Sequence, residues 1–245
     1  MDNALFVGLS RQMVLRHEMD IVANNIANAD TAGFKLESLM SKTEPKRPAN
    51  TAPGPRPVKF VLDDGVARDF GQGTLRSTGG ALDLAIEGQG FFTITTPDGE
   101  RYTRDGRFTM DPSGKLITES GATVAGDGGG EVVIDPEKGP VTISADGVVS
   151  QGSERVGKIG VVTFDSLAAL EKTGDNLFRN TSNLQPQPAT AAVVRQGMLE
   201  SSNVRPIVEI TRMIEVTRSY ERITKMLDST AELSRRSIER LGRMN

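Results

Sequence analysis

One histidine and no cysteine limit the chemistry that this sequence can support. His17 is the only histidine in the chain. Because cysteine is absent, a metal site at His17 would need several carboxylates gathered around it, and no spacing of Asp or Glu provides them. We therefore expect His17 to lie at a surface or an interface, and we expect no metal site.

The other candidate motifs are explained by local structure. The segment Gly126-Asp127-Gly128-Gly129-Gly130 is glycine-rich like a phosphate loop, but it lacks the Lys-Ser/Thr that contacts phosphate and metal, so it predicts a flexible turn. Asp105 and Asp111 lie in chain-reversing segments, where Asp needs no catalytic role. Composition does not exclude a carboxylate pair for glycoside hydrolysis, but no feature selects one. We expect no catalytic residue and no cofactor.

The longest element that the sequence predicts is a C-terminal helix over residues 204–241. Its apolar residues recur every seven positions, with a second row three or four residues on, and no Pro or Gly interrupts them. Asn203 stands where an N-cap is expected, and Pro206 lies in the first turn. A helix of this length cannot bury its stripe by folding on itself, so it needs a partner. The two rows are Met213, Tyr220, Leu227, Ser234 and Leu241, and Val216, Ile223, Ala231 and Ile238.

A second amphipathic helix is expected over residues 3–29. Its rows are Leu5, Gln12, Met19 and Ile26, and Gly8, Leu15 and Val22. The period is again near 3.5, and nothing local covers the stripe. The partner of each helix could be any helix of the same domain. We infer instead that the two terminal helices pair with each other as an α-helical coiled coil.

Asparagine is concentrated where the first helix should end. Asn24 and Asn28 lie one turn apart on one face, with Asn25 beside them, although Asn is a poor residue inside a helix. Gly33 can adopt the left-handed conformation that terminates a helix. The cluster is either a frayed helix end or a set of amides that bridge to neighbouring chains.

Between the helices the period changes to two, which predicts an α+β chain with a central antiparallel β-domain of short hairpins. We expect four regions: an N-terminal helix and signature over 1–35, an extended Pro-rich linker over 36–72, a β-rich domain over 73–195 and the C-terminal helix over 196–245. Asp105-Gly106 and Asp111–Gly114 are expected to be hairpin turns. A short helical turn is expected at 165–170 and a polar return over 176–187. The expected strands are 58–62, 82–87, 91–95, 101–104, 107–110, 115–118, 131–134, 141–144, 147–150 and 158–164.

Charge and composition exclude several classes of function. The chain of 245 residues carries a net charge of −3 and no concentrated basic patch, so we expect no nucleic-acid partner. The first residues have Asp2 where a signal peptide has a basic residue, and no run is long enough to span a membrane. By these rules alone the protein would be cytoplasmic.

Four segments together resemble one protein family. The run from Asn24 to Lys35, the segment from Leu82 to Phe92, the hairpin from Tyr102 to Phe108 and the pattern Gln-Gly-x-Leu-Glu-x-Ser-Asn-Val ending at Val204 are similar to signatures of the bacterial flagellar rod and hook proteins. The signatures occur in the right order and cover both ends and much of the middle of the chain.

This resemblance implies a structural subunit of the flagellar basal-body rod, not an enzyme. Length and a single β-domain favour a proximal rod protein, with a distal rod protein as the alternative. The resemblance implies polymerisation with copies of itself and other rod proteins, transmission of motor torque, and a periplasmic location reached through the flagellar type III export apparatus without a cleaved signal peptide. It implies no nucleic acid and no small-molecule substrate as partners. Because an exported chain stays unfolded until assembly, we also expect residues 1–30 and 204–245 to be partly disordered in the free subunit.

The positions assigned to the subunit interface lie on the two stripes, in the Asn cluster and at the junction before the C-terminal helix: Leu5, Leu15, Met19, Val22, Asn24, Asn25, Ile26, Asn28, Glu200, Asn203, Val204, Met213, Val216, Tyr220, Ile223, Leu227, Ile238 and Leu241. Two other functions stay open. One is a carbohydrate-active β-domain on a helical oligomerisation stalk, for which specific sugar binding or turnover would be evidence. The other is a coiled-coil adaptor for another protein's helix, which predicts a discrete complex in solution.

Overall fold

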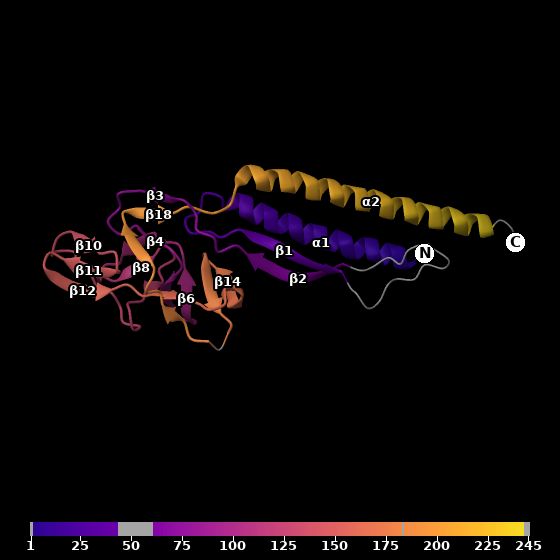
Figure 1. Ribbon diagram of the computed structural model, residues 1–245. Helices are drawn as coiled ribbons and strands as arrows, with labels where there is room; N and C mark the ends of the chain where they lie inside the picture. The colour runs from indigo at the N-terminus through magenta and orange to yellow at the C-terminus, as the bar shows by residue number, and fades with distance from the viewer. Residues whose placement is uncertain (1, 44–60, 183, 243–245) are drawn as a thin grey trace. The chain divides into compact units, whose positions relative to one another are not determined.

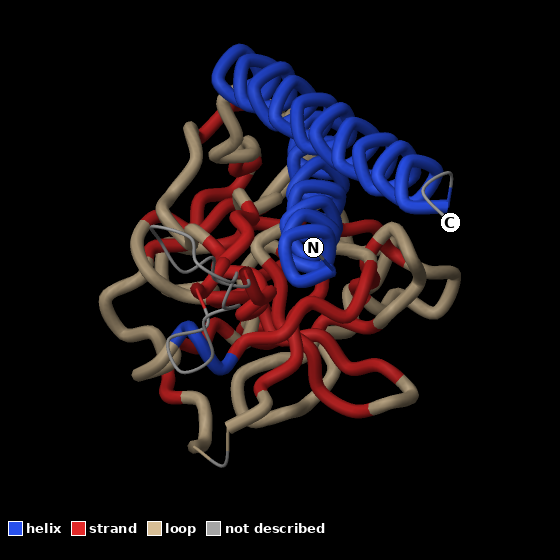
Figure 2. The backbone as a smooth tube through the Cα atoms, turned by 90° about the vertical axis from the view of Figure 1, so that its right-hand side faces the viewer, coloured by secondary structure: helices blue, strands red, loops and turns tan. Residues whose placement is uncertain are grey.

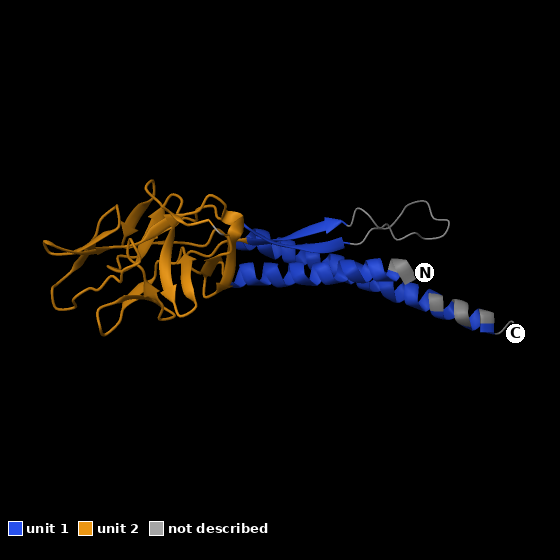
Figure 3. Cartoon of the chain, turned by 90° about the horizontal axis from the view of Figure 1, so that it is seen from below, with its two compact units in different colours: residues 1–27, 37–68, 205–245 blue, residues 28–36, 69–204 orange. Residues whose placement is uncertain are grey.

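The computed structural model describes residues 2–43, 61–182 and 184–242 and confirms the α+β class. The chain forms two compact units (Figure 3). Unit 1 contains residues 1–27, 37–68 and 205–245, and unit 2 contains residues 28–36 and 69–204. Each unit is described separately.

Unit 1 is built on two long helices that lie side by side and run antiparallel (Figure 1, Figure 2). Helix α1 is Asp2–Ala27 and helix α2 is Pro206–Gly242, so α2 begins at the proline expected in its first turn. The Gln12 amide donates to Thr224 Oγ1 (3.0 Å), and Arg212 Nη2 donates to Glu18 Oε1 (3.1 Å). These contacts place the start of each helix beside the later part of the other.

The predicted stripes meet between α1 and α2. Leu15 and Val22 of one row and Val216 of α2 are buried. Gly8, in the same row, allows the closest approach, because a Cβ added there would lie 2.6 Å from Leu227 Cδ2. A side chain larger than hydrogen at Gly8 would therefore force the two helices apart or move Leu227.

Two strands occupy part of the segment that was expected to be an extended linker over 36–72. Strand β1 (Glu37–Thr43) pairs antiparallel with β2 (Val61–Arg68), with a shift of register between Met40 and Ser41. This hairpin lies along α1, on a different side from α2 (Figure 1). The composition of these residues indicated a solvated linker, but they form a β-hairpin because they pack on α1. The Pro-rich residues 44–60, and with them the start of the strand expected at 58–62, lie outside the described residues.

Unit 2 is a set of antiparallel sheets made from short strands. One sheet has the order β14-β15-β6-β5-β9-β8-β7, with β13 pairing with β5 and β16 pairing with β13. A second contains β10-β11-β12, and the pairs β4–β17 and β3–β18 complete the unit. The bounds are β3 Leu75–Ser77, β4 Leu84–Glu87, β5 Phe91–Thr96, β6 Gly99–Thr103, β7 Phe108–Met110, β8 Leu116–Thr118, β9 Thr123–Val124, β10 Val141–Ile143, β11 Val148–Gln151, β12 Glu154–Lys158, β13 Val161–Thr163, β14 Leu170–Gly174, β15 Leu177–Asn180, β16 Gln187–Pro188, β17 Val193–Gln196 and β18 Met198–Glu200.

The core of unit 2 has two parts. The larger is mainly aliphatic and is centred on β4, β5 and neighbouring strands. It includes Leu84, Ile86, Phe92, Ile94 and Leu116. The smaller is a cluster of rings around Phe91, Tyr102 and Phe178, which stack edge to face with Phe70 and Phe164. Ala85 is as fully buried as Leu84 and Ile86, so β4 is covered on both faces and is not the half-buried strand that its alternation indicated.

Several local expectations for unit 2 were wrong. Residues 131–134 form only isolated bridges, and 158–164 is divided between β12 and β13. Asp105-Gly106 is not a hairpin turn, since β6 and β7 pair with other strands; a Cβ at Gly106 would lie 1.6 Å from Leu84 O, so the glycine allows two backbones to cross. The hairpin at Asp111–Gly114 and the short helix Leu167–Ala169 are confirmed. The polar stretch after residue 175 contains the unexpected strand β15.

Candidate functional site

Asn25 ties three elements of unit 1 together. Its side chain is fully buried, and Nδ2 donates to Glu37 O of β1 (2.7 Å) and to Glu209 Oε2 of α2 (2.9 Å). Its Oδ1 accepts a hydrogen bond from Glu37 N (3.1 Å). The amide therefore bonds inside its own chain, and Asn25 holds α1, β1 and α2 in place from an internal position.

The carboxylates around Asn25 have distinct partners. Arg68 Nε donates to Glu37 Oε1 (2.8 Å) across the β1–β2 hairpin. Glu209 lies in the first turn of α2 and is only 3% exposed. A carboxylate in that turn is favoured by the partial positive charge at a helix N-terminus. The polar cluster thus fixes the start of α2 as well as the end of α1.

The other two residues of the Asn cluster differ from Asn25. Asn24 is exposed, and Asn28 is half-buried. Asn28 accepts two hydrogen bonds from Thr31, one from the hydroxyl to Oδ1 (3.2 Å) and one from the backbone N–H to its carbonyl (3.2 Å). Asn28 therefore shapes the turn after α1.

In unit 2 a buried ion cluster joins three of the four signature segments. Glu200 Oε1 accepts from Lys35 Nζ (2.6 Å) and from the Gly73 N–H (2.8 Å), and Glu200 Oε2 accepts from Arg104 Nη1 (3.1 Å). The three charged side chains are at most 4% exposed. One carboxylate lies between two cations, so the cluster carries a positive charge when all three groups are ionised.

Backbone carbonyls complete this cluster. Lys35 Nζ also donates to Gly71 O (2.8 Å), and Arg104 Nη2 donates to Gly88 O (2.7 Å). Burial lowers the pKa of Lys35 below its usual value, and the Glu200 carboxylate opposes that shift. Lys35 ends the first signature, Arg104 lies in the hairpin signature and Glu200 lies in the pattern before α2. The ion pairs therefore connect these three segments within the fold of unit 2.

Gly33 and Asn203 have different roles from those predicted. Helix α1 ends at Ala27, so Gly33 (φ +66°) does not terminate it; the Gly33 N–H donates to Glu200 O (2.7 Å), and a Cβ there would lie 2.4 Å from Arg104 C. Asn203 is not an N-cap, since its Oδ1 accepts from Leu36 N (2.8 Å) and its Nδ2 donates to Asp69 O (2.8 Å). Both residues fix close chain crossings within unit 2.

The positions assigned to an interface fall into three groups. Buried in the single chain are Leu15, Val22, Asn25, Glu200, Val204 and Val216. Half-buried are Met19, Ile26, Asn28, Asn203, Met213, Tyr220, Ile223 and Leu227, whereas Leu5 and Asn24 are exposed. The side chains of Ile238 and Leu241 lie outside the described part of the structure.

Sequence reasoning missed a second set of apolar positions. On α2, Ile207, Ile210 and Ile214 are 82%, 48% and 47% exposed. On α1, Phe6, Leu9 and Met13 are 55%, 43% and 67% exposed. Spacings of three and four residues place each trio on one helix face, and this spacing was visible in the sequence beside the heptad rows.

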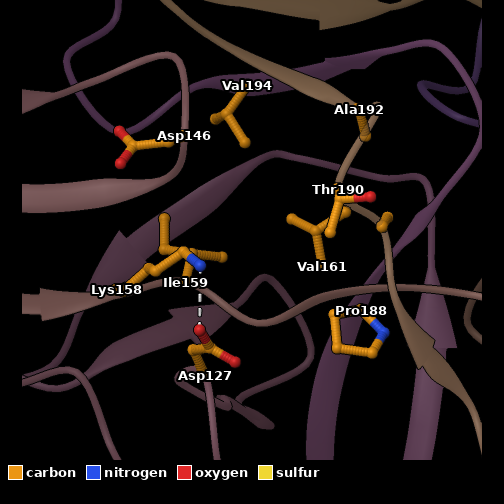
Figure 4. A pocket seen from close by; sticks show the side chains of 10 residues that line it. Asp127, Asp146, Lys158, Ile159, Val161, Pro188, Thr190, Ala192 and Val194 are labelled. Carbon is orange, nitrogen blue, oxygen red and sulfur yellow. Dashed lines mark hydrogen bonds and ion pairs between the residues drawn. The ribbon is translucent and has the colours of Figure 1, made fainter.

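The candidate polar sites hold no arrangement for catalysis. His17 Nδ1 bonds to Asp63 Oδ2 (2.6 Å), and a hydrogen bond from the Gly65 N–H, followed by the His17 ring, lowers the pKa of Asp63. A pocket in unit 2 (Figure 4) has a volume of about 60 Å³, and Lys158 on its wall already bonds to Asp127 (2.8 Å). That volume holds only a few water molecules. Among the described residues, no three His, Asp or Glu side chains gather as a metal site requires.

Comparisons with known proteins match the same segments. A family model described as flagella basal body rod protein matches residues 5–35, one described as flagellar hook protein FlgE/F/G D1 domain matches 85–151, and one described as flagellar basal body rod FlgEFG protein C-terminal matches 195–240. The flagellar basal-body rod protein FlgF of Caulobacter vibrioides is 61% identical over 245 residues and is covered completely, as is this chain. The chain belongs to the flagellar basal-body rod protein family.

Other relatives agree with this assignment. The FlgF protein of Mesorhizobium japonicum is 35% identical over 99% of both chains. The FlgG protein of Bacillus subtilis is 32% identical over 94% of this chain and 96% of its own. The predicted function, a structural subunit of the flagellar basal-body rod, is confirmed, with greater similarity to FlgF than to FlgG. The relatives are rod structural proteins, so the chain is not an enzyme.

Within the described ranges, neither helix has the length and apolar character needed to cross a membrane.

Proposed function

We propose that α1 and α2 form an antiparallel coiled coil and that this coiled coil is the part of the rod subunit that assembles. The heptad spacing, the burial of Leu15 and Val22, and the close approach of Gly8 to Leu227 support it. Ile238 and Leu241 continue the α2 row by spacing and are proposed contacts of the same seam. Asn25, Glu200 and Asn203 support assembly indirectly, because they fix the chain that carries the helices.

The observation that carries the proposal is the exposed apolar trio on each helix. Ile207 and Val216 are nine residues apart, which places them on opposite sides of α2. The Val216 side is buried in the chain, whereas Ile207, Ile210 and Ile214 remain in solvent. Contiguous exposed apolar side chains typically mark protein–protein contacts. These outer faces, with Leu5 and Asn24, are therefore the surface that we assign to neighbouring subunits.

The neighbours are copies of this chain and other proximal and distal rod proteins. A head-to-tail contact that repeats without closing produces a helical filament. Many such seams resist torsion, so the filament transmits motor torque through the cell envelope. The greater similarity to FlgF than to FlgG supports a proximal position. Neither a nucleic acid nor a small-molecule substrate is part of this function.

A role as a rod subunit also predicts where the protein is found in the cell. We propose that the subunit reaches the periplasm through the flagellar type III export apparatus and retains its N-terminus. The intact mass of the protein from purified basal bodies tests this. A mass that includes the residues of α1 is expected, and a mass that lacks them would contradict export without cleavage.

Charge on the outer face of α2 tests the assembly surface. We expect Ile207→Asp with Ile210→Asp to abolish swimming and to remove the protein from purified basal bodies. Asp at position 207, in the first turn, is favoured by the helix N-terminus, and position 210 is an exposed site in the next turn. The matched control is Val133→Asp with Leu184→Asp, two exposed apolar residues of unit 2. Normal swimming with the α2 variant, or equal loss with the control, would contradict the proposal.

A further inference from the structure

The turn between β14 and β15 consists of two residues with positive φ. Asp175 (φ +46°) and Asn176 (φ +58°) are consecutive left-handed residues, and they are the non-glycine residues with positive φ in the described ranges. Because β14 ends at Gly174 and β15 begins at Leu177, these two residues are the loop of a two-residue hairpin. Positive φ at both loop residues is what a type I′ hairpin turn requires, and Asn and Asp are among the residues that adopt it. The role of the turn is therefore inferred from its contacts.

The turn contacts the segment of residues 28–36, which follows α1 in the chain and belongs to unit 2. Asn176 Nδ2 donates to Ala32 O (2.8 Å), and the carbonyl of Asn176 accepts from Thr103 Oγ1 (2.9 Å). On the same hairpin, Lys172 Nζ lies 4.3 Å from the centroid of the Phe34 ring. Phe34 itself is 2% exposed. The hairpin therefore contacts two neighbouring parts of the segment, one through its turn and one through strand β14.

The Asn176 side chain does not serve its own turn. In a turn that Asn stabilises locally, the side-chain oxygen accepts a hydrogen bond from a nearby backbone N–H. Here Asn176 Oδ1 is buried and has no hydrogen-bond partner among the described atoms. The bond that the side chain makes is the one from its amino group to Ala32 O. The orientation of the carboxamide thus serves the 28–36 segment.

We propose that the β14–β15 hairpin is a clasp that holds residues 28–36 on unit 2. The left-handed backbone points the Asn176 amino group at Ala32 O while its carbonyl meets Thr103. The clasp lies beside the bonds from Gly33 N to Glu200 O (2.7 Å) and from Leu36 N to Asn203 Oδ1 (2.8 Å), so it resists peeling of the segment at its first residues. This role does not depend on what unit 1 assembles with.

Two adjacent glycine substitutions in the full chain separate the clasp from a simple turn. Asp175→Gly keeps the left-handed turn and the Asn176 side-chain carboxamide, whereas Asn176→Gly keeps the turn and removes the carboxamide. We expect Asn176→Gly to accelerate hydrogen exchange of the Gly33 and Leu36 amides roughly 3- to 10-fold, as loss of one hydrogen bond does. Asp175→Gly should leave both amides unchanged.

A second variant tests the hydrogen bond without new backbone freedom. Asn176→Asp keeps the size and the tolerance of left-handed backbone, but it places a carboxylate oxygen opposite Ala32 O. We expect faster exchange of the same two amides, with exchange in β10–β12 unchanged in the same sample. Unchanged Gly33 and Leu36 amides in both Asn176 variants would overturn the clasp. A uniform rise across unit 2 would do so as well, since it would indicate a general loss of stability.

Discussion

Glu200 is a buried carboxylate that holds separate segments of unit 2 together. It bonds to two buried cations, and it also accepts the Gly73 N–H. A buried ion pair is weak evidence for a net gain in stability. Removal of its carboxylate is different, because it leaves the buried Lys35 and Arg104 charges without the carboxylate to which both are hydrogen-bonded.

Glu200→Gln should lower the free energy of unfolding of unit 2 by about 3–5 kcal/mol. The matched control is Glu87→Gln, which breaks the Glu87–Arg195 pair, where both side chains are about half exposed. That control should cost less than about 1 kcal/mol, since solvent screens an exposed pair. Denaturant unfolding of the full chain measures both values. Equal losses would contradict the account of the cluster.

The lowered pKa of Lys35 predicts a dependence of stability on alkaline pH. Burial places this pKa below its ordinary value of 10.5 in the folded chain. Between the lowered pKa and 10.5, the unfolded chain binds more protons than the folded chain, so this group makes folding more favourable as pH rises. The free energy of unfolding, compared between wild type and Lys35→Met over that range, should show this increment only in the wild type. The same pH dependence in both proteins would rule out Lys35 as its source.

Asn25 shows what short-range patterns miss about single residues. The sequence marks Asn25 as unusual, because Asn is unfavourable inside a helix. It does not reveal the partners, since Glu37 and Glu209 are 12 and 184 residues away along the chain. The sequence therefore leaves two interpretations open, a frayed helix end or amides that bridge to neighbouring chains, whereas the structure shows that Asn25 bonds within its own chain. Likewise, the charges of Lys35, Arg104 and Glu200 reside in separate signatures, and no spacing predicts that they meet.

The helices were the most predictable elements, because their rows repeat over many turns. Strands in unit 2 with alternating or aromatic residues, such as β5, were predicted as well. The hairpin β14–β15 was missed because polar and charged residues separate its few apolar ones and its turn has no glycine at Asp175 or Asn176. Its pairing is stabilised by contacts far along the chain, such as that of Phe178 with Tyr102, which local composition does not indicate.

The antiparallel register of α1 and α2 is tested at Gly8. A Leu side chain there would overlap Leu227, since even a Cβ at Gly8 lies 2.6 Å from Leu227 Cδ2. We expect Gly8→Leu to lower the free energy of unfolding of unit 1 in the wild-type background. In the Leu227→Ala background the same change should be neutral or stabilising, because the new side chain fills the space that Leu227 leaves.

The double-mutant cycle gives the coupling between the two sites. A favourable coupling of about 0.5–3 kcal/mol is expected for residues in direct contact. Thermal or denaturant unfolding of the four proteins measures it. Additive effects of the two substitutions would mean that Gly8 and Leu227 do not face each other.

For the molecule as a rod subunit, the sequence identified the family and the elements, but not which helix faces remain free. On each helix, the rows predicted for the interface contain residues that are buried within the chain itself, including Leu15 of α1 and Val216 of α2. The exposed trios on the other faces emerge only when the pairing of α1 with α2 is known. We therefore propose that subunits assemble through the outer helix faces.

Because the chain has no cysteine, a single introduced thiol can test directly whether the outer face of α2 is covered in the assembled rod. Ile207→Cys places a single thiol on the outer face of α2, at a position 82% exposed in the free chain, and Leu184→Cys places one in unit 2 at a position 58% exposed. Maleimide labelling of each variant is compared between the free protein and purified basal bodies. We predict that Ile207→Cys reacts readily in the free protein and is shielded in basal bodies, whereas Leu184→Cys reacts in both. Labelling of Ile207→Cys at the same rate in basal bodies as in the free protein would contradict the account.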